Sequence, residues 1–169
     1  MAASKFLALV SGRLREVIAT AVSAGVADDG KIVALGTDGR LDGSVMPVGI
    51  GADTKAIQAS ETLSAGDLVN IWNSGGVFRV RKADATTSGK EAHGFVLAGA
   101  NINTVATVYL EGTITGFSNL LPNRYYLSTT PGGVTETPPG NSGNVVQFIG
   151  SSVSVTEISF EATDGVILA

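Results

Sequence analysis

Cysteine is absent from the 169-residue chain, and histidine occurs once, at His93. The lack of cysteine excludes a disulfide framework, thiol catalysis and zinc held by cysteine. A single histidine excludes a two-histidine metal site or a facial triad within one chain. We therefore expect neither a metal nor another cofactor.

His93 is the one residue of the type most often used as a catalytic base. It lies in the segment Glu-Ala-His-Gly, and Glu91, two residues earlier, would share its face of a strand. A general base also needs a nucleophile within reach. The sequence contains no Gly-x-Ser-x-Gly turn that would present a serine. We interpret His93 as a structural strand residue and expect a protein that is not an enzyme.

Charge is sparse as well, at 15% of residues with a net charge of -4. The 11 basic residues are scattered, and their densest cluster is Arg79, Arg81 and Lys82. Nucleic-acid binding uses a basic face that this chain lacks, so we expect no nucleic-acid partner. Arg79 and Arg81 alternate toward one side of a strand, and we favour a solvated face over a phosphate site.

Long hydrophobic runs are missing too. The N-terminal apolar run, Phe6–Val10, has only five residues before Ser11 and Gly12. Such a run is too short for a signal peptide or a membrane span. We expect synthesis in the cytoplasm and no membrane partner.

Two short motifs resemble ligand-binding loops but lack residues that define them. Gly49–Thr54 begins like a dinucleotide fingerprint, yet the third glycine is missing and no parallel βαβ pattern surrounds it. Asp28, Asp29, Asp38 and Asp42 gather in one segment without the spacing or the terminal glutamate of an EF-hand loop. We favour a loop for the first motif, and turns rather than weak calcium binding for the second.

The patterns that are present predict an all-β protein preceded by an arm. Residues 1–55 are rich in Gly, Ala and Asp with weak periodicity. We expect an extended arm there, with little regular structure, that gains order by lying on something else. Residues 56–169 alternate short apolar runs with turn signals about every eight to twelve residues. We expect a small β-barrel or sandwich of about eight strands there, of β-tulip or jelly-roll type.

Within the arm, two apolar runs flank Ser11 and Gly12. Phe6–Val10 and Arg13–Val17 fit a small hairpin, although apolar residues also recur at helical spacing. Gly12 and the β-branched residues disfavour a helix. We therefore favour strands.

Turn residues place the strands of the β-rich part. Asn73–Gly76 and Pro131–Gly133 are expected hairpin loops, because glycine supplies the positive φ that such turns require. Pro138-Pro139 cannot donate to a ladder and ends a strand or protects a sheet edge. The apolar alternation along Ser152–Glu161 slips at Thr156-Glu157, which predicts a β-bulge.

Three aromatic residues, Trp72, Tyr125 and Tyr126, are candidates for a surface contact. Exposed together, such rings would form a platform on which sugars stack. Aromatic side chains more often belong to a core or to a subunit contact. We favour the core or subunit contact.

Several stretches resemble structural proteins of tailed-bacteriophage virions. Residues 5–17 and 24–54, which include DDGKIVALGTDGRLDG and MPVGIG, are similar to the N-terminal segment of phage head-decoration, head-fibre and some tail-fibre proteins. Residues 61–99, 108–117 and 123–139 are similar to the β-rich domain of phage capsid decoration, or cement, proteins. The last stretch, NRYYLSTTPGGVTETPP, carries a tyrosine pair, a Pro-Gly-Gly turn and a closing Pro-Pro.

This resemblance covers nearly the whole chain and implies a capsid decoration protein on the outer surface of the phage head. Such a protein bridges neighbouring copies of the major capsid protein. A homo-oligomer is implied, and the three-fold positions of a capsid favour a trimer. One departure is Asn123-Arg124, which stands where the family pattern often has glycine before the tyrosine pair.

The arm's apolar residues are the expected contacts with the partner: Phe6, Leu7, Leu9, Val45 and Met46. It is equally open that they cover the β-rich domain's own core. An alternative function is a tail-fibre or head-fibre module that binds a glycan on the host surface. In that case the contact residues would be Trp72, Tyr125 and Tyr126.

Overall fold

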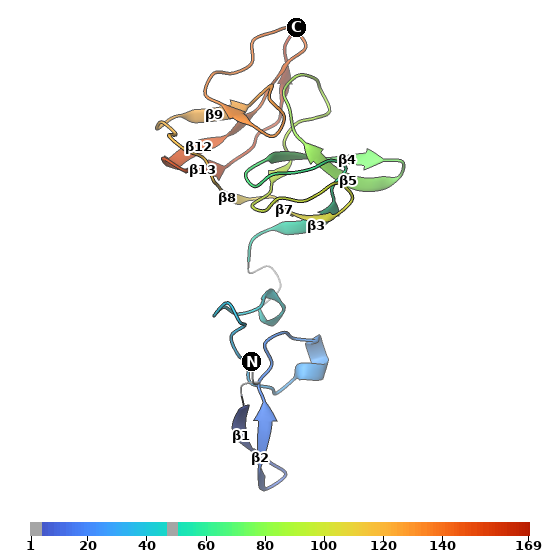
Figure 1. Ribbon diagram of the computed structural model, residues 1–169, viewed down its shortest axis with the longest axis vertical. Coiled ribbons are helices and arrows are strands. Elements are labelled where there is room, and N and C mark those ends of the chain that lie inside the picture. The colour runs from blue at the N-terminus through green and yellow to red at the C-terminus, as the bar shows by residue number, and fades with distance from the viewer. Residues whose placement is uncertain (1–4, 47–50) are drawn as a thin grey trace. The chain divides into compact units, whose positions relative to one another are not determined.

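The structure is a computed structural model and describes residues 5–46 and 51–169 (Figure 1). The chain divides into two compact units, Met1–Gly51 and Ala52–Ala169. Strands and two short 3-10 helices are the regular elements of the described residues, which contain no α-helix. The all-β prediction is therefore confirmed.

The first unit begins with a β-hairpin, drawn as the blue arrows of Figure 1. Strand β1, Lys5–Val10, pairs antiparallel with β2, Arg13–Ile18. Ser11 and Gly12 form the two-residue turn with φ of 52° and 77°, as a type I′ turn requires. The strand interpretation is confirmed over the helical one, because the turn falls where a helix would have to continue.

The rest of the first unit has little regular structure. It contains the 3-10 helices η1, Gly25–Asp28, and η2, Gly43–Val45, and a parallel bridge between Thr20 and Val33. None of its described residues is buried. The described part of this unit therefore has hydrogen-bonded turns and a hairpin but no hydrophobic core.

The second unit contains two five-stranded sheets. One has the order β3-β7-β6-β4-β5 and the other the order β10-β9-β12-β13-β8. The first sheet comprises β3 Thr54–Gln58, β4 Leu68–Ser74, β5 Val77–Lys82, β6 Gly94–Phe95 and β7 Val105–Tyr109. The second comprises β8 Gly112–Thr115, β9 Arg124–Leu127, β10 Val134–Thr135, β12 Phe148–Ser154 and β13 Glu157–Phe160. A short pair, β11 Val145–Val146 with β14 Val166–Ile167, completes the unit. None of these sheets closes into a barrel, so the sandwich alternative fits.

Two apolar clusters form the core of the second unit. Neighbouring residues of the chain enter different clusters, because successive side chains of an extended segment point to opposite sides. Leu68 and Phe95 belong to the cluster that also takes Ile114, Leu127, Ile149 and Phe160 from the second sheet. Val69 and Val96, the next residues along, belong to the cluster with Ile57, Ala59, Leu63, Val80, Ala106 and Val108. The first cluster thus joins the two sheets.

The predicted hairpin loops are confirmed. Between β4 and β5, the Asn73 side chain accepts a hydrogen bond from the Gly76 backbone N–H at 2.7 Å. Between β9 and β10, Gly132 has φ of 79° and the Gly133 N–H donates to the Thr130 carbonyl at 3.0 Å. In both loops glycine adopts the conformation that other residues avoid.

The predicted bulge at Thr156-Glu157 is misplaced. Val155 and Thr156 form the turn between β12 and β13, and the register irregularity lies on β12 between Ser152 and Ser154. The segment is a hairpin rather than one strand. Val153, before the turn, and Val155, in the turn, are exposed, whereas Ile158 and Phe160, after the turn, are buried.

Candidate functional site

The hairpin of the first unit carries an exposed apolar face, which we call the hairpin face: Leu7, Leu9, Leu14 and Ile18. Their exposed fractions are 72%, 71%, 72% and 56%. The register places Leu9 opposite Leu14, Leu7 opposite Glu16, and Lys5 opposite Ile18. Residues at these positions share one side of the hairpin. Large apolar side chains are thus held together in water.

Lys5 and Glu16 are the charged residues of β1 and β2 that lie on the same side as the hairpin face, and they pair with each other. The Lys5 Nζ lies 2.5 Å from the Glu16 Oε1. Both side chains are exposed, so this ion pair contributes little stability. It does leave the face without an uncompensated charge.

The opposite side of the hairpin is different in character. Phe6, Ala8 and Val17 are half-buried there, and Arg13 and Arg15 are exposed. This side carries two positive charges. On the side of the hairpin face, by contrast, all four large apolar side chains are more than half exposed and the two charged side chains pair with each other.

The five predicted arm contacts do not form one surface. Leu7 and Leu9 lie on the hairpin face, while Phe6 lies on the opposite side. Val45 ends η2 and lines a hollow with Thr20 and Val33. Met46, 37% exposed, caps that short helix.

Sequence reasoning missed Leu14 and Ile18. The signal that could have identified them is the turn at Ser11 and Gly12. A two-residue turn fixes the register of a hairpin, and this register places Leu14 opposite Leu9.

Trp72 lies on β4 and is half-buried. The Arg81 guanidinium lies 4.7 Å from the centre of its ring, and its indole N–H donates to the Ser60 hydroxyl at 3.2 Å. One face of the ring is therefore occupied by a cation of the same chain. Arg81 also donates to Asn70 and to the Gly89 carbonyl, so it is bonded to the protein rather than freely solvated.

Tyr125 and Tyr126 lie on β9, in the other sheet from Trp72. Tyr125 is only 3% exposed, and its hydroxyl donates to Glu136 at 3.0 Å and accepts from the Leu121 N–H at 3.1 Å. Burial, aided by the neighbouring Glu136, raises the pKa of Tyr125. Tyr126 packs edge-on against Phe148. The three aromatics thus have separate partners, and Tyr125 is not a surface side chain.

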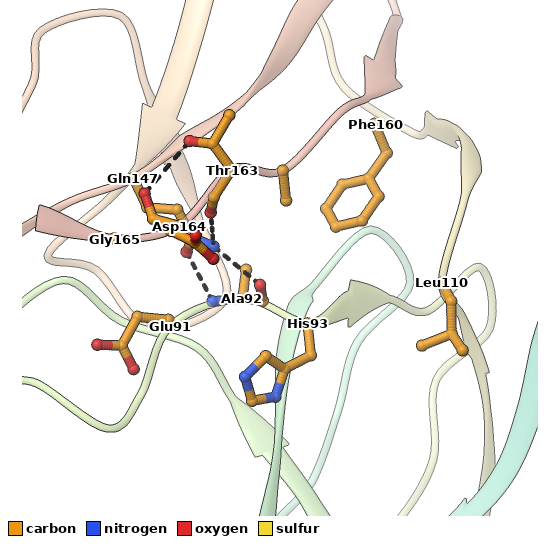
Figure 2. Close-up of a pocket in the computed structure, with 10 residues that line it drawn as sticks. Glu91, Ala92, His93, Leu110, Gln147, Phe160, Thr163, Asp164 and Gly165 are labelled. Atoms are coloured by element: carbon orange, nitrogen blue, oxygen red, sulfur yellow. Dashed lines mark hydrogen bonds between the residues drawn. The ribbon is translucent and has the colours of Figure 1, made fainter.

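His93 lines a cavity of about 500 Å³, which Figure 2 shows together with Glu91, Gln147, Phe160 and Asp164. The ring Nδ1 accepts a hydrogen bond from the Ile71 backbone N–H at 3.0 Å. In a neutral imidazole the proton then resides on Nε2. His93 lies just before β6, and its ring accepts this hydrogen bond from the backbone of β4. The ring therefore has a structural role here.

Gln147 is buried beside this cavity and holds two chain segments together (Figure 2). Its Oε1 accepts from the Ala92 N–H at 2.7 Å, and its Nε2 donates to the Ala92 and Thr163 carbonyls, both at 2.9 Å. All its hydrogen-bonding groups are used within the chain. Nothing in the sequence pattern distinguishes this glutamine from an exposed one.

The described residues contain no group of three or more His, Asp or Glu side chains that could hold a metal ion. In the described part of the chain, no helix is both long enough and apolar enough to cross a membrane.

Comparisons with known proteins add no identity. No family model matches the chain. No curated protein shows significant similarity to it.

Proposed function

We propose that the chain is a structural protein of a tailed-phage virion. It is a decoration protein that binds the outer surface of the head and stabilises the lattice of the major capsid protein. The observation that carries the proposal is the hairpin face, four large apolar side chains exposed on a unit whose described residues include none that is buried. The phrases of the sequence that resemble phage decoration proteins support the same function.

An isolated two-stranded hairpin is only marginally stable in water. An exposed apolar cluster on such an element is typical of a protein–protein contact. Each fully buried leucine or isoleucine contributes about 1.5–3 kcal/mol. A partner that covers the hairpin face therefore supplies the burial that the first unit does not provide for itself.

A capsid lattice suits a contact of this size. Each copy offers a small apolar surface, and the contacts repeat over many equivalent positions. Copies joined to one another bind a repeating surface with far higher avidity than a single copy. A homotrimer at the three-fold positions is the oligomer that we propose, following the symmetry of capsids.

The alternative, a fibre module that binds a glycan through Trp72, Tyr125 and Tyr126, has less support. A sugar platform requires ring faces that are open to solvent. Tyr125 is buried, and Arg81 lies over the Trp72 ring. We therefore place the contact on the arm.

The test is binding of the purified chain to expanded phage heads that lack the decoration protein, measured by co-sedimentation. The variant Leu14→Glu/Ile18→Glu changes two side chains of the hairpin face, both on β2. Loss of their burial is expected to weaken binding about a hundredfold or more. The control Val22→Glu/Val26→Glu changes two valines that are 65% and 93% exposed elsewhere in the arm. Equal binding by the two double variants would contradict the proposal.

A further inference from the structure

Among the described residues, strand β1 pairs only with β2, so its other edge has no partner there. In antiparallel pairs, residues alternate between those that bond to the neighbouring strand and those that point their N–H and C=O groups away. The two-residue turn makes Val10 and Arg13 a bonded pair. It follows that Lys5, Leu7 and Leu9 direct their backbone groups to the free edge.

Proteins protect sheet edges with charged side chains, proline, bulges or a covering segment. Within residues 5–46 and 51–169, the free edge of β1 has no central charge, no proline, no bulge and no strand paired with it. The strand reads Lys-Phe-Leu-Ala-Leu-Val, and its one charge, Lys5, is at the end and pairs with Glu16 on β2. The strand contains no proline, and its register with β2 is regular over all six pairs. Its edge is therefore open to another strand.

Strand β2 is protected at its outer edge. It carries Arg13, Arg15 and Glu16 within six residues. By the same alternation, Glu16 directs its backbone groups outward near the middle of the strand. Symmetric pairing of two copies around Glu16 would place two carboxylates opposite each other, which is unfavourable. Of the two hairpin edges, that of β1 accepts a second copy.

We propose that the free edge of β1 pairs antiparallel with the same edge of a second copy of this chain. The two-fold axis passes beside Leu7, so that Leu7 lies opposite the second copy's Leu7. Lys5 then lies opposite Leu9, and Phe6 opposite Ala8. Leu7 bonds to its counterpart in both directions, as does Lys5 to Leu9, because these residues have their backbone groups free.

The occupant is a second copy because β1 is complementary to itself. The strand has no uncompensated charge that would select an acidic or a basic partner. The symmetric register keeps Arg13 and Arg15 on the two outer strands, away from the axis. The result is a four-stranded sheet in the order β2-β1-β1-β2, which is more stable than either hairpin alone.

This pairing leaves the hairpin face uncovered and joins two such faces side by side on one side of the new sheet. It therefore goes beyond the proposed capsid contact, and because a two-fold pairing joins only two chains, it links chains of neighbouring homotrimers rather than chains within one homotrimer. The pairing needs no capsid, so the purified chain tests it alone. Leu14→Glu/Ile18→Glu changes only β2 and is expected to leave the pairing intact, so the two proposals fail separately.

The first experiment is disulfide trapping in the full-length protein, which contains no natural cysteine. Leu7→Cys brings two thiols together at the axis, with Cα atoms about 5.5 Å apart, within the range that a disulfide spans. Leu9→Cys is the matched control, since Leu9 has the same residue type, strand and face and nearly the same exposure, 71% against 72%. In the proposed register the two thiols of Leu9→Cys lie four residues apart along the strands, about 13 Å.

We expect covalent dimers from Leu7→Cys under mild oxidation and few from Leu9→Cys. Equal cross-linking of both variants would overturn the register. Absence of cross-linking in both would overturn the pairing.

The second experiment exchanges charge at the axis. Leu7→Lys and Leu7→Glu each place like charges opposite one another, and each is expected to weaken self-association about tenfold or more. An equal mixture of the two variants restores it, because Lys then faces Glu. The readout is molar mass by analytical ultracentrifugation at several concentrations. A wild-type chain that stays monomeric, or a mixture that behaves like its components, would refute the proposal.

Discussion

Gly150 passes so close to Ser159 on the neighbouring strand that a Cβ atom at Gly150 would lie 1.8 Å from the Ser159 carbonyl oxygen. The same atom would lie 3.0 Å from the Ile158 side chain, which is fully buried. Gly150 pairs with both Phe160 and Tyr125, at the centre of the second sheet. A residue with any side chain forces β12 and β13 apart at this point.

Gly150→Ala is therefore expected to lower the free energy of unfolding by about 3 kcal/mol or more, since extra volume in a packed interior displaces backbone. Urea unfolding followed by tryptophan fluorescence measures this. The control is Gly140→Ala, where an added Cβ would have no heavy atom within 4 Å. An equal effect of the two substitutions would show that the close approach is not what limits this position.

Replacement of Gln147 is expected to destabilise the second unit strongly. Gln147→Leu keeps most of the volume but removes the partner of the Ala92 N–H and of the Ala92 and Thr163 carbonyls. Buried groups left without partners cost about 1–3 kcal/mol each. Thermal unfolding should show a lower midpoint for Gln147→Leu than for His93→Ala, which leaves only the Ile71 N–H without its partner. A milder effect of Gln147→Leu would contradict this ranking.

Asp84 is expected to make stability depend on pH at the acid end. Burial alone would raise the pKa of Asp84, but hydrogen bonds from Lys90 and Thr86 outweigh burial and lower the pKa below its ordinary value of 3.8. A carboxyl with a lowered pKa in the folded state contributes stability that is present above the unfolded pKa. That stability is lost as the pH falls through the folded pKa.

Asp84→Asn should therefore destabilise the protein most at neutral pH, and its difference from wild type should shrink below about pH 4. Urea unfolding at a series of pH values measures this difference. Asp164→Asn, at an exposed position, is the matched control. A difference between Asp84→Asn and wild type that is constant with pH would refute the role of the charge.

The turn of the hairpin offers a stabilising substitution. Ser11 has φ of 52°, a conformation that serine adopts rarely, and Gly12 follows with φ of 77°. Asn-Gly is the preferred pair for a type I′ turn. Ser11→Asn is expected to stabilise the hairpin by about 0.5 kcal/mol, and Ser11→Val to weaken it, because β-branched residues avoid positive φ. Chemical shifts of β1 and β2 report the hairpin population, and equal shifts in both variants would contradict this account.

Local signals in the sequence predicted the fold class and several turns correctly. Asn73–Gly76 and Pro131–Gly133 could be identified because glycine and proline restrict the backbone by themselves. Thr156 was placed in a bulge instead of a turn, because alternating apolar residues continue across the β12–β13 connection. A pattern of period two does not show which half of a hairpin will be buried.

The candidate site could be predicted only in part, since exposure depends on what lies opposite. Leu7 and Leu9 were identified from their apolar character alone. Leu14 and Ile18 required the hairpin register, and the burial of Tyr125 required knowledge of which strands flank β9. The sequence pattern shows which residues share a face of a strand. Which of the two faces is exposed to solvent depends on the elements that pack against the strand.

The lack of buried residues among those described in the first unit has a calorimetric consequence. The heat capacity change of unfolding comes mainly from apolar surface that becomes exposed. In this chain that surface belongs to the two clusters of the second unit. The heat capacity change measured in a thermal melt therefore comes almost entirely from the second unit, and the arm contributes little to it. Binding of a partner to the hairpin face buries apolar surface of the arm and gives a negative heat capacity change of binding. Titration calorimetry at several temperatures therefore measures the contribution of the arm, which thermal unfolding does not.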